Sequence, residues 1–300
     1  MRPPGDVIVA TIARDRRQIV ADLVALTKLR VVLMVLVTTL VGYYVGLDGA
    51  PDYARMLHLV IGTALAAGGT LALNQYWERD VDARMERTRA RPLPQGRLEP
   101  LEALGFGAAI SVIGVGYLAA SVNLPAALVT GTIVIVYVFA YTPLKLHTAL
   151  CTVVGAVPGA LPPVIGWVAA RDALGAGAWV LFGILFFWQL PHALAIARLY
   201  RDDYARAGIR VLPAVDPRGS RTERYIVVSC VALTAVSLLA TPAGMAGDVY
   251  FVAAFALGAV FAIFGARQAL APSPTAIRRV LFASLVYLPL VLAVLVLDKR

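Results

Sequence analysis

Three oxygen-bearing side chains recur at every fourth position in the stretch LNQYWERDVD, namely Asn74, Glu78 and Asp82. On a helix, each step of four residues turns by about 400° and rises by about 6 Å, so these three residues share one face with about 40° of drift per step. Asp80 is expected to point away from that face. Oxygen ligands suit Mg²⁺, which usually takes one or two carboxylates together with water and phosphate oxygens. The spacing therefore predicts a set of magnesium ligands, which we call the oxygen ladder.

A run of arginines follows the ladder and includes Arg87, Arg91 and Arg97. Guanidinium groups match the geometry of phosphate oxygens, so carboxylates followed by arginines are what a metal-bound diphosphate requires. The alternative is a solvated loop of mixed charge. Asn74 argues against that alternative because it lies inside the apolar run LALNQYW, and polar residues at membrane depth face the bundle interior or a cavity.

The elements that must position the ladder are membrane helices. Of the 300 residues, 60% are hydrophobic and the mean hydropathy is +0.77, whereas soluble domains are about 45–50% apolar. A helix of about 20 apolar residues crosses a hydrocarbon core of about 30 Å. The apolar runs predict an all-α membrane protein with nine transmembrane helices, near residues 25–46, 57–78, 102–120, 124–142, 151–170, 176–197, 225–241, 248–266 and 279–297.

The distribution of Lys and Arg predicts how these helices are oriented. With the N-terminus inside, the interior stretches hold 23 of the 27 basic residues, and the exterior holds Arg55, Arg171, Lys299 and Arg300. This is the positive-inside pattern. The net charge of +9 therefore reflects topology, and no nucleic-acid partner is expected.

This topology predicts how the chain is organised around the membrane. We expect a cytoplasmic segment at residues 1–24, without a cleavable signal peptide, and one intramembrane domain at 25–300. The protein should be a multi-pass component of the cell inner (plasma) membrane, in contact with the lipid bilayer. Its polar site should face the cytoplasm.

Two long polar loops lie on the predicted cytoplasmic side, at 79–101 and 198–224, and each pairs carboxylates with arginines. Because each follows an even-numbered helix, they favour two related halves that meet at one cytoplasmic mouth. In the second loop, Asp202 and Asp203 are each either functional or simply solvated.

Two further residues, Lys145 and His192, could carry chemistry, whereas the two cysteines are not expected to. Lys145, at the cytoplasmic end of the fourth helix, is either a topology anchor or a diphosphate contact. His192, in the sixth helix, is either functional or a bundle residue with satisfied hydrogen bonds. Cys151 and Cys230 lie in apolar runs and predict neither a disulfide nor a zinc site.

The stretch NQYWERDVD, followed by MERTRARPLPQGRL, resembles the first signature of the UbiA superfamily of intramembrane prenyltransferases. That signature reads N-x-x-x-D-x-x-x-D and continues as R-T-x-x-R-P-L. Asn74 and Asp82 match it, whereas Glu78 stands where Asp is commonest. Glutamate keeps the charge and the oxygen donor but reaches one methylene further. The resemblance implies a UbiA-type helical bundle that binds a prenyl diphosphate through Mg²⁺.

Three further stretches resemble the branch of that superfamily that farnesylates heme. They are LTKLRVVLMVLVTTLVGYYVG, YTPLKLHTALCTVVGAVPGALPPVIGW and FWQLPHALAIARLYRDDYARAGIRVLP. Leu146, Cys151 and Ala193 depart from the residues common in that branch. Tyr200 and Tyr204 occupy the places where quinone-prenylating relatives carry the end carboxylates of a second motif, which is typical of the heme branch.

The resemblance implies a reaction and a set of roles. The farnesyl group of farnesyl diphosphate would pass to the 2-vinyl group of protoheme IX (heme b) and give heme O. Heme A synthase or terminal-oxidase assembly would be the functional partners. The implied metal ligands are Asn74, Glu78 and Asp82, the implied catalytic residues are Asp82, Asp203 and Lys145, and the implied substrate-binding residues are Arg87, Arg91, Tyr141, His192 and Tyr204. Tyr76, Trp77 and Trp188 are further aromatic residues that could shield an allylic cation.

Two alternatives remain at this point. One is a UbiA-type enzyme with another acceptor, such as 4-hydroxybenzoate or a naphthoate. The other is a transporter for an anionic lipid or heme, although transporters often have broken helices at the bilayer midplane, whereas the polar cluster here lies at one helix end.

Overall fold

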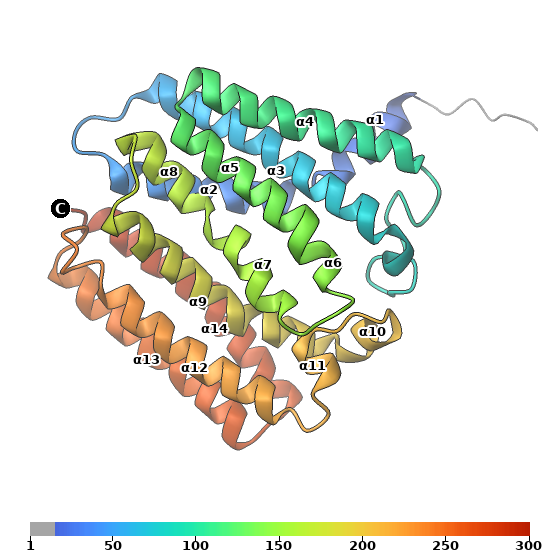
Figure 1. The fold of residues 1–300 in the computed structure, drawn as a ribbon. Helices are drawn as coiled ribbons and strands as arrows, with labels where there is room; N and C mark the ends of the chain where they lie inside the picture. The colour runs from blue at the N-terminus through green and yellow to red at the C-terminus, as the bar shows by residue number, and fades with distance from the viewer. Residues whose placement is uncertain (1–15) are drawn as a thin grey trace, which may run out of the picture.

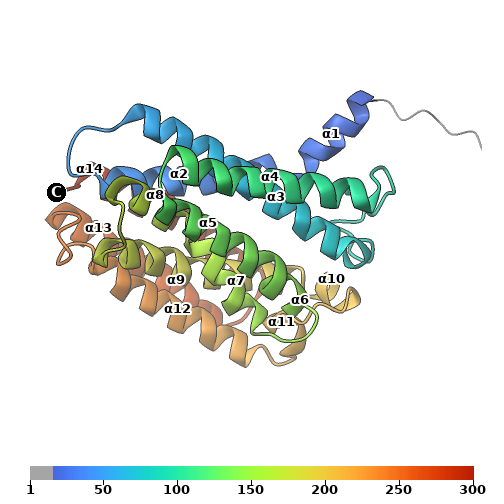
Figure 2. The same cartoon turned by 45° about the horizontal axis from the view of Figure 1, so that its top comes forward.

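The computed structural model describes residues 16–300, and within that range the chain is built from helices and contains no β-strand. The helices pack side by side with nearly parallel axes, and both views show the link from α3 to α4 and the α10–α11 region at the same end of the bundle (Figures 1 and 2). The elements are α1 (Arg16–Leu26), α2 (Leu29–Gly46), α3 (Tyr53–Asp82), α4 (Pro100–Ser121), α5 (Leu124–Ile135), η1 (Val136–Tyr141), α6 (Thr142–Leu144), α7 (Cys151–Ala160), α8 (Pro162–Arg171), α9 (Ala176–Leu199), α10 (Arg201–Arg206), α11 (Leu212–Val215), α12 (Ser220–Leu238), α13 (Asp248–Leu270) and α14 (Pro274–Leu297).

Eight of the described helical segments are long and apolar enough to cross a membrane, where the sequence predicts nine. The remaining predicted span corresponds to α12, which exists as a helix of 19 residues. Its first turn carries Arg221, Glu223 and Arg224, so part of its length is polar. The all-α membrane architecture is thus confirmed, and the ninth crossing stays a prediction.

Two of the predicted spans are irregular. The fourth runs through α5, η1 and α6, where η1 is a π-helical turn. The fifth is divided at Leu161 into α7 and α8. Pro162 and Pro163 follow directly and lack backbone N–H groups, so they cannot continue the hydrogen-bond ladder of α7. In contrast, α9 continues through Pro191 without interruption.

Close backbone contacts hold the membrane helices together. A Cβ atom at Gly42 of α2 would lie 1.9 Å from the carbonyl oxygen of Pro163, and one at Gly166 of α8 would lie 1.9 Å from that of Thr39. Only glycine fits at these two positions, because any Cβ atom would collide with the backbone of the neighbouring helix. Such small residues allow membrane helices to approach closely. The C-terminal helices α9, α12, α13 and α14 form a second bundle that shares the main apolar core.

The N-terminal helix α1 packs against the C-terminal part of α3 and the N-terminal part of α4. Its Leu26 is fully buried beside Ala72 and Leu98, and its Asp22 accepts a hydrogen bond from Arg97 Nε at 3.1 Å. Of the predicted segment 1–24, residues 1–15 lie outside the described part of the chain. Arg97, which the sequence predicts as one of the phosphate-binding arginines after the ladder, instead pairs with Asp22.

The opposite end of the bundle holds the predicted exterior basic residues. Arg55 pairs with Asp172 at 3.4 Å, Arg171 pairs with Asp48 at 2.5 Å, and Lys299 Nζ donates to the carbonyl of Leu47 at 2.6 Å. The C-terminus lies at this end (Figure 1). The separation of these residues from the long polar loops agrees with the charge pattern of the sequence.

Candidate functional site

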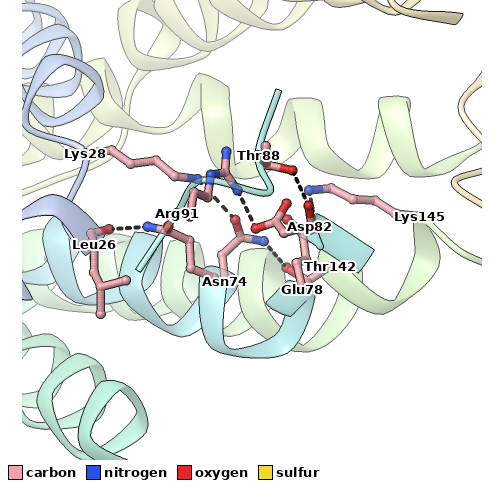
Figure 3. A network of polar contacts seen from close by, with 10 residues as sticks. Leu26, Lys28, Asn74, Glu78, Asp82, Thr88, Arg91, Thr142 and Lys145 are labelled. Carbon is pink, nitrogen blue, oxygen red and sulfur yellow. Dashed lines mark hydrogen bonds and ion pairs between the residues drawn. The ribbon is translucent and has the colours of Figure 1, made fainter. Parts of the chain in front are cut away.

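All three ladder residues lie on α3, which extends to Asp82, four residues beyond the predicted end of this span. Asn74 and Asp82 are buried, with 1% and 3% of their surfaces exposed. The side chain of Asp80 is 77% exposed and pairs with Arg79. The helical spacing thus turns the ladder toward the protein interior (Figure 3) and Asp80 away from it.

Each ladder residue contacts a basic side chain from a different part of the chain (Figure 3). Lys145 Nζ lies 2.5 Å from Glu78 Oε1, and Arg91 Nη1 lies 2.5 Å from Asp82 Oδ2. Lys28 Nζ donates to Asn74 Oδ1 at 3.5 Å. Three cations and two carboxylates therefore converge at the end of α3. Such a set can exchange its internal pairs for a metal ion and a polyanion, because the metal takes the carboxylates and the anion takes the cations.

Of the three cations at the ladder, Lys28 could not be identified from the sequence, where it was only one of the basic residues on the predicted cytoplasmic side. It links α1 to α2 in the left-handed conformation, with φ 50° and ψ 60°. Burial, followed by the nearby Arg91, lowers the pKa of Lys28 to about 7. A bound anion would favour the charged form of this lysine again.

A hydrogen-bond chain orients the amide of Asn74. Its Nδ2 donates to Thr142 Oγ1 at 3.1 Å, and Thr142 Oγ1 in turn donates to the carbonyl of Tyr137 at 2.8 Å. This leaves Asn74 Oδ1 on the side of the ladder that Lys28 faces. The ring of Tyr141 lies 4.3 Å from Lys145 Nζ and packs against Gly155 of α7. The fourth span therefore contributes Tyr141, Thr142 and Lys145 to one site.

The second cytoplasmic loop forms an adjoining group. Asp203 Oδ1 accepts from the backbone N–H of Glu86 at 2.9 Å and from Arg206 Nη2 at 2.9 Å. Burial opposes ionisation of Asp203, but these donors outweigh it and hold the pKa of the carboxyl below its ordinary value. Its Oδ2 is buried and has no partner among the described residues. Asp202, by contrast, is exposed.

The structure separates the predicted arginines and tyrosines. Arg87 is exposed and lies 5.9 Å above the ring of Tyr200, next to Asp203 and not to the ladder. Tyr204 packs with Met85 in the contact between the two loops. The backbone N–H of Arg210 donates to the carbonyl of Lys145 at 2.7 Å, which joins this group to the ladder site.

His192 lies apart from both groups, at the contact between α9 and α14. Its Nδ1 is 2.8 Å from Ser284 Oγ, and its ring stacks on Trp188 with centroids 4.9 Å apart. Two other aromatic candidates are also engaged elsewhere: Tyr76 lies under Arg79, and Trp77 is 52% exposed. Among the aromatic residues named from the sequence, Tyr141 stands closest to the ladder cations.

An apolar chamber begins one helical turn from the ladder. It has a cavity volume of about 140 Å³, and its lining includes Thr70 of α3, four residues before Asn74. Its walls come from α2, α3, α5, η1, α7 and α8, and include Val31, Val35, Ala66, Ile133 and Tyr137. A molecule with an anionic head and a long apolar tail would fit a cationic site joined to this chamber.

The ladder residues have the right donors for Mg²⁺ if a ligand completes the shell. Within residues 16–300, no three His, Cys, Asp or Glu side chains gather around one point. The ladder instead offers two carboxylates and one amide oxygen. Mg²⁺ sites that also bind phosphate commonly use one or two carboxylates and take further oxygens from the phosphate groups and water. The donor set therefore fits a metal that binds together with a diphosphate.

Comparison with known proteins places this chain in a family. The model described as the UbiA prenyltransferase family matches residues 35–286. The protoheme IX farnesyltransferase of Solibacter usitatus is 46% identical over 287 residues, covering 93% of this chain and 98% of the relative. That of Koribacter versatilis is 44% identical over 306 residues, covering 97% and 95%.

Solved structures show the same fold. A UbiA homolog from Aeropyrum pernix K1 has a TM-score of 0.70 at 18% identity and covers 89% of this chain and 97% of its own. A UbiA homolog from Archaeoglobus fulgidus, solved with GPP and Mg²⁺, has a TM-score of 0.64 at 17% identity and covers 91% and 99%. The chain therefore belongs to the UbiA prenyltransferase family, in the branch of the protoheme IX farnesyltransferases.

Proposed function

We propose that this protein transfers the farnesyl group of farnesyl diphosphate to the 2-vinyl group of protoheme IX (heme b), giving heme O and diphosphate. The C1–O bond of the donor breaks, and its electron pair stays with the diphosphate oxygen. The electron pair of the vinyl double bond forms the new C–C bond to C1. Water then adds to the resulting cation and loses a proton, which leaves a hydroxyethylfarnesyl group.

The observation that carries the proposal is the junction of the ladder with the apolar chamber. Cationic groups at Lys28, Arg91 and Lys145 lie at the end of α3, and the chamber begins at Thr70. A diphosphate bound at the cations would direct its prenyl chain into the chamber. The high identity to protoheme IX farnesyltransferases supports heme as the acceptor.

Asn74, Glu78 and Asp82 would hold Mg²⁺, which supplies Lewis-acid stabilisation of the departing diphosphate. Lys145 and Arg91 would bind the same diphosphate directly, since both already lie beside the ladder carboxylates. Their charges stabilise the negative charge that grows on the leaving group in the transition state. Arg87 would act from the adjoining group at the loop surface.

The acceptor would contact the second half of the chain. His192 offers an imidazole held by Ser284, and Asp203 offers a carboxylate oxygen without a partner among the described residues. Tyr204 packs with Met85 where the two loops meet, and we assign it to substrate binding. We assign His192 to heme binding. We assign Asp203 to the catalytic site, where it also holds the first loop in place through the backbone N–H of Glu86.

We also propose the membrane arrangement that the charge pattern predicts. Residues 25–300 would form one intramembrane domain with nine crossings, α12 included, in the cell inner membrane. The N-terminus and the ladder would face the cytoplasm, and heme A synthase or terminal-oxidase assembly would use the product. The grouping of Arg55, Arg171 and Lys299 at the end opposite the ladder supports this arrangement.

Incubation of the purified protein with heme b, farnesyl diphosphate and Mg²⁺, followed by mass spectrometry, tests the proposal. Prenylated heme should form, and chelation of divalent metal or Asp82→Ala should abolish it. Asp80→Ala is the matched control, because it removes an exposed carboxylate from the same helix. Prenylation of 4-hydroxybenzoate with unchanged heme would refute the proposal that heme b is the acceptor. Absence of Mg²⁺-dependent diphosphate release would favour the transporter.

A further inference from the structure

The π-helical turn η1 is attached to the metal-binding ladder. The backbone N–H of Thr142 bonds to the carbonyl of Tyr137, five residues earlier, and the Thr142 hydroxyl donates to the same carbonyl at 2.8 Å. That hydroxyl also accepts from Asn74. Short π-helical turns occur frequently at functional sites, where they re-aim side chains. The turn therefore sets the position of Tyr137 relative to the ladder.

Tyr137 stands at the boundary between the cationic site and the apolar chamber. Its ring lies 5.0 Å from that of Tyr141 in an edge-on arrangement of 64°, and the Tyr141 ring lies 4.3 Å from Lys145 Nζ. On the other side, Tyr137 lines the chamber together with Thr70. It is the one aromatic residue among the described residues that line this chamber.

The reacting carbon of the donor must occupy the same boundary. Its oxygen belongs to the diphosphate at the cations, and its chain belongs in the chamber. When the C1–O bond breaks, the electron pair leaves with the diphosphate and C1 carries an allylic positive charge in a poorly hydrated space. The face of an aromatic ring attracts a cation through its quadrupole, and more strongly when the pair is desolvated.

We propose that Tyr137 is a further catalytic residue, whose ring stabilises the allylic cation at C1. The inference rests on the proposed prenyl transfer. Tyr141 is less suited to this task because its ring already contacts the Lys145 ammonium and is confined by Gly155. The ring of Tyr137, not its hydroxyl, performs the stabilisation.

Single-turnover transfer from farnesyl diphosphate tests this role. Tyr137→Leu should slow the chemical step by about 30-fold, which corresponds to about 2 kcal/mol, while Tyr137→Phe should stay within about threefold of the wild type. Phe139→Leu is the matched control, because it removes an aromatic ring from the same π-helical turn, and Phe139 is 64% exposed. Equal slowing by Tyr137→Leu and Phe139→Leu would overturn the inference, as would a Phe variant as slow as Leu.

A second measurement keeps the shape of the site constant. Phenylalanines with one, two and three ring fluorines at position 137 withdraw electron density while changing volume little. The logarithm of the single-turnover rate should fall stepwise with fluorine number, and a flat series would overturn the proposal even if Tyr137→Leu misfolds. If the wild type releases diphosphate but prenylates no heme, heme is not the acceptor. The variants at position 137 are then compared by their rates of diphosphate release. A wild type that never breaks the C1–O bond refutes both.

Discussion

The ion pair between Glu78 and Lys145 allows stability and activity to be separated. Both side chains are largely buried, with 13% and 15% of their surfaces exposed, and the two charged atoms lie 2.5 Å apart. Burial opposes the charge on Lys145, but the Glu78 carboxylate raises the pKa of this lysine well above its ordinary value. Lys145→Met would therefore leave a buried carboxylate without its cation.

Removal of one partner from a buried pair costs about 3–5 kcal/mol, whereas replacement of both by neutral groups of similar size is often close to neutral. Lys145→Met should accordingly destabilise the protein by about 3–5 kcal/mol. The double variant Glu78→Gln/Lys145→Met should recover most of that loss. It should remain inactive, because it lacks both a predicted metal ligand and a predicted diphosphate contact.

Reversible unfolding in mixed detergent micelles gives the free energies, and single-turnover farnesyl transfer gives the activities. Arg171→Met is the matched control, because Arg171 pairs with Asp48 at the same 2.5 Å but at an exposed position. Its loss should cost no more than about 1 kcal/mol. Equal costs for Lys145→Met and Arg171→Met, or an active double variant, would refute the reasoning.

Three further outcomes are expected. Because the pKa of Lys28 is lowered to about 7, the unfolded chain binds more protons from about pH 7 to 10, and stability rises with pH in that window. Lys28→Met should therefore stabilise the ligand-free protein by up to about 5 kcal/mol near pH 7, and this gain should fade toward pH 10. The variant should also have a raised KM for farnesyl diphosphate. Equal gains in stability at both pH values would contradict the lowered pKa of Lys28. The Asp203 carboxylate contributes stability above about pH 4, and this stability is lost as the pH falls through its lowered folded pKa. Because this carboxylate accepts the backbone N–H of Glu86, Asp203→Asn should speed hydrogen exchange of the Glu86 amide at neutral pH. Unchanged exchange would argue that Asp203 does not hold the first loop. His192→Phe should abolish heme farnesylation while hydrolysis of the donor continues, and parallel loss of both reactions would remove His192 from heme binding.

The local features of the site could be predicted from the sequence because they depend on short-range periodicity. The apolar run predicts a helix at 57–78, which the structure extends to Asp82, and the spacing of four places Asn74, Glu78 and Asp82 on one face and Asp80 on another. Burial of the ladder follows from the apolar residues around it. The position of Glu78 as the central ligand stays a prediction, although its buried contact with Lys145 places it in the network.

Only the tertiary structure decided which distant residues complete the ladder. Lys28 and Thr142 come from the α1–α2 link and the fourth span, and nothing in their own sequence neighbourhoods pairs them with Asn74. The packing also separates Arg87 from the ladder. Helix periodicity reports the face of a residue within its own helix. The partner across that face depends on how the helices pack and on where irregular turns such as η1 fall, and this is why the chemistry could be predicted from the sequence while the geometry required the fold.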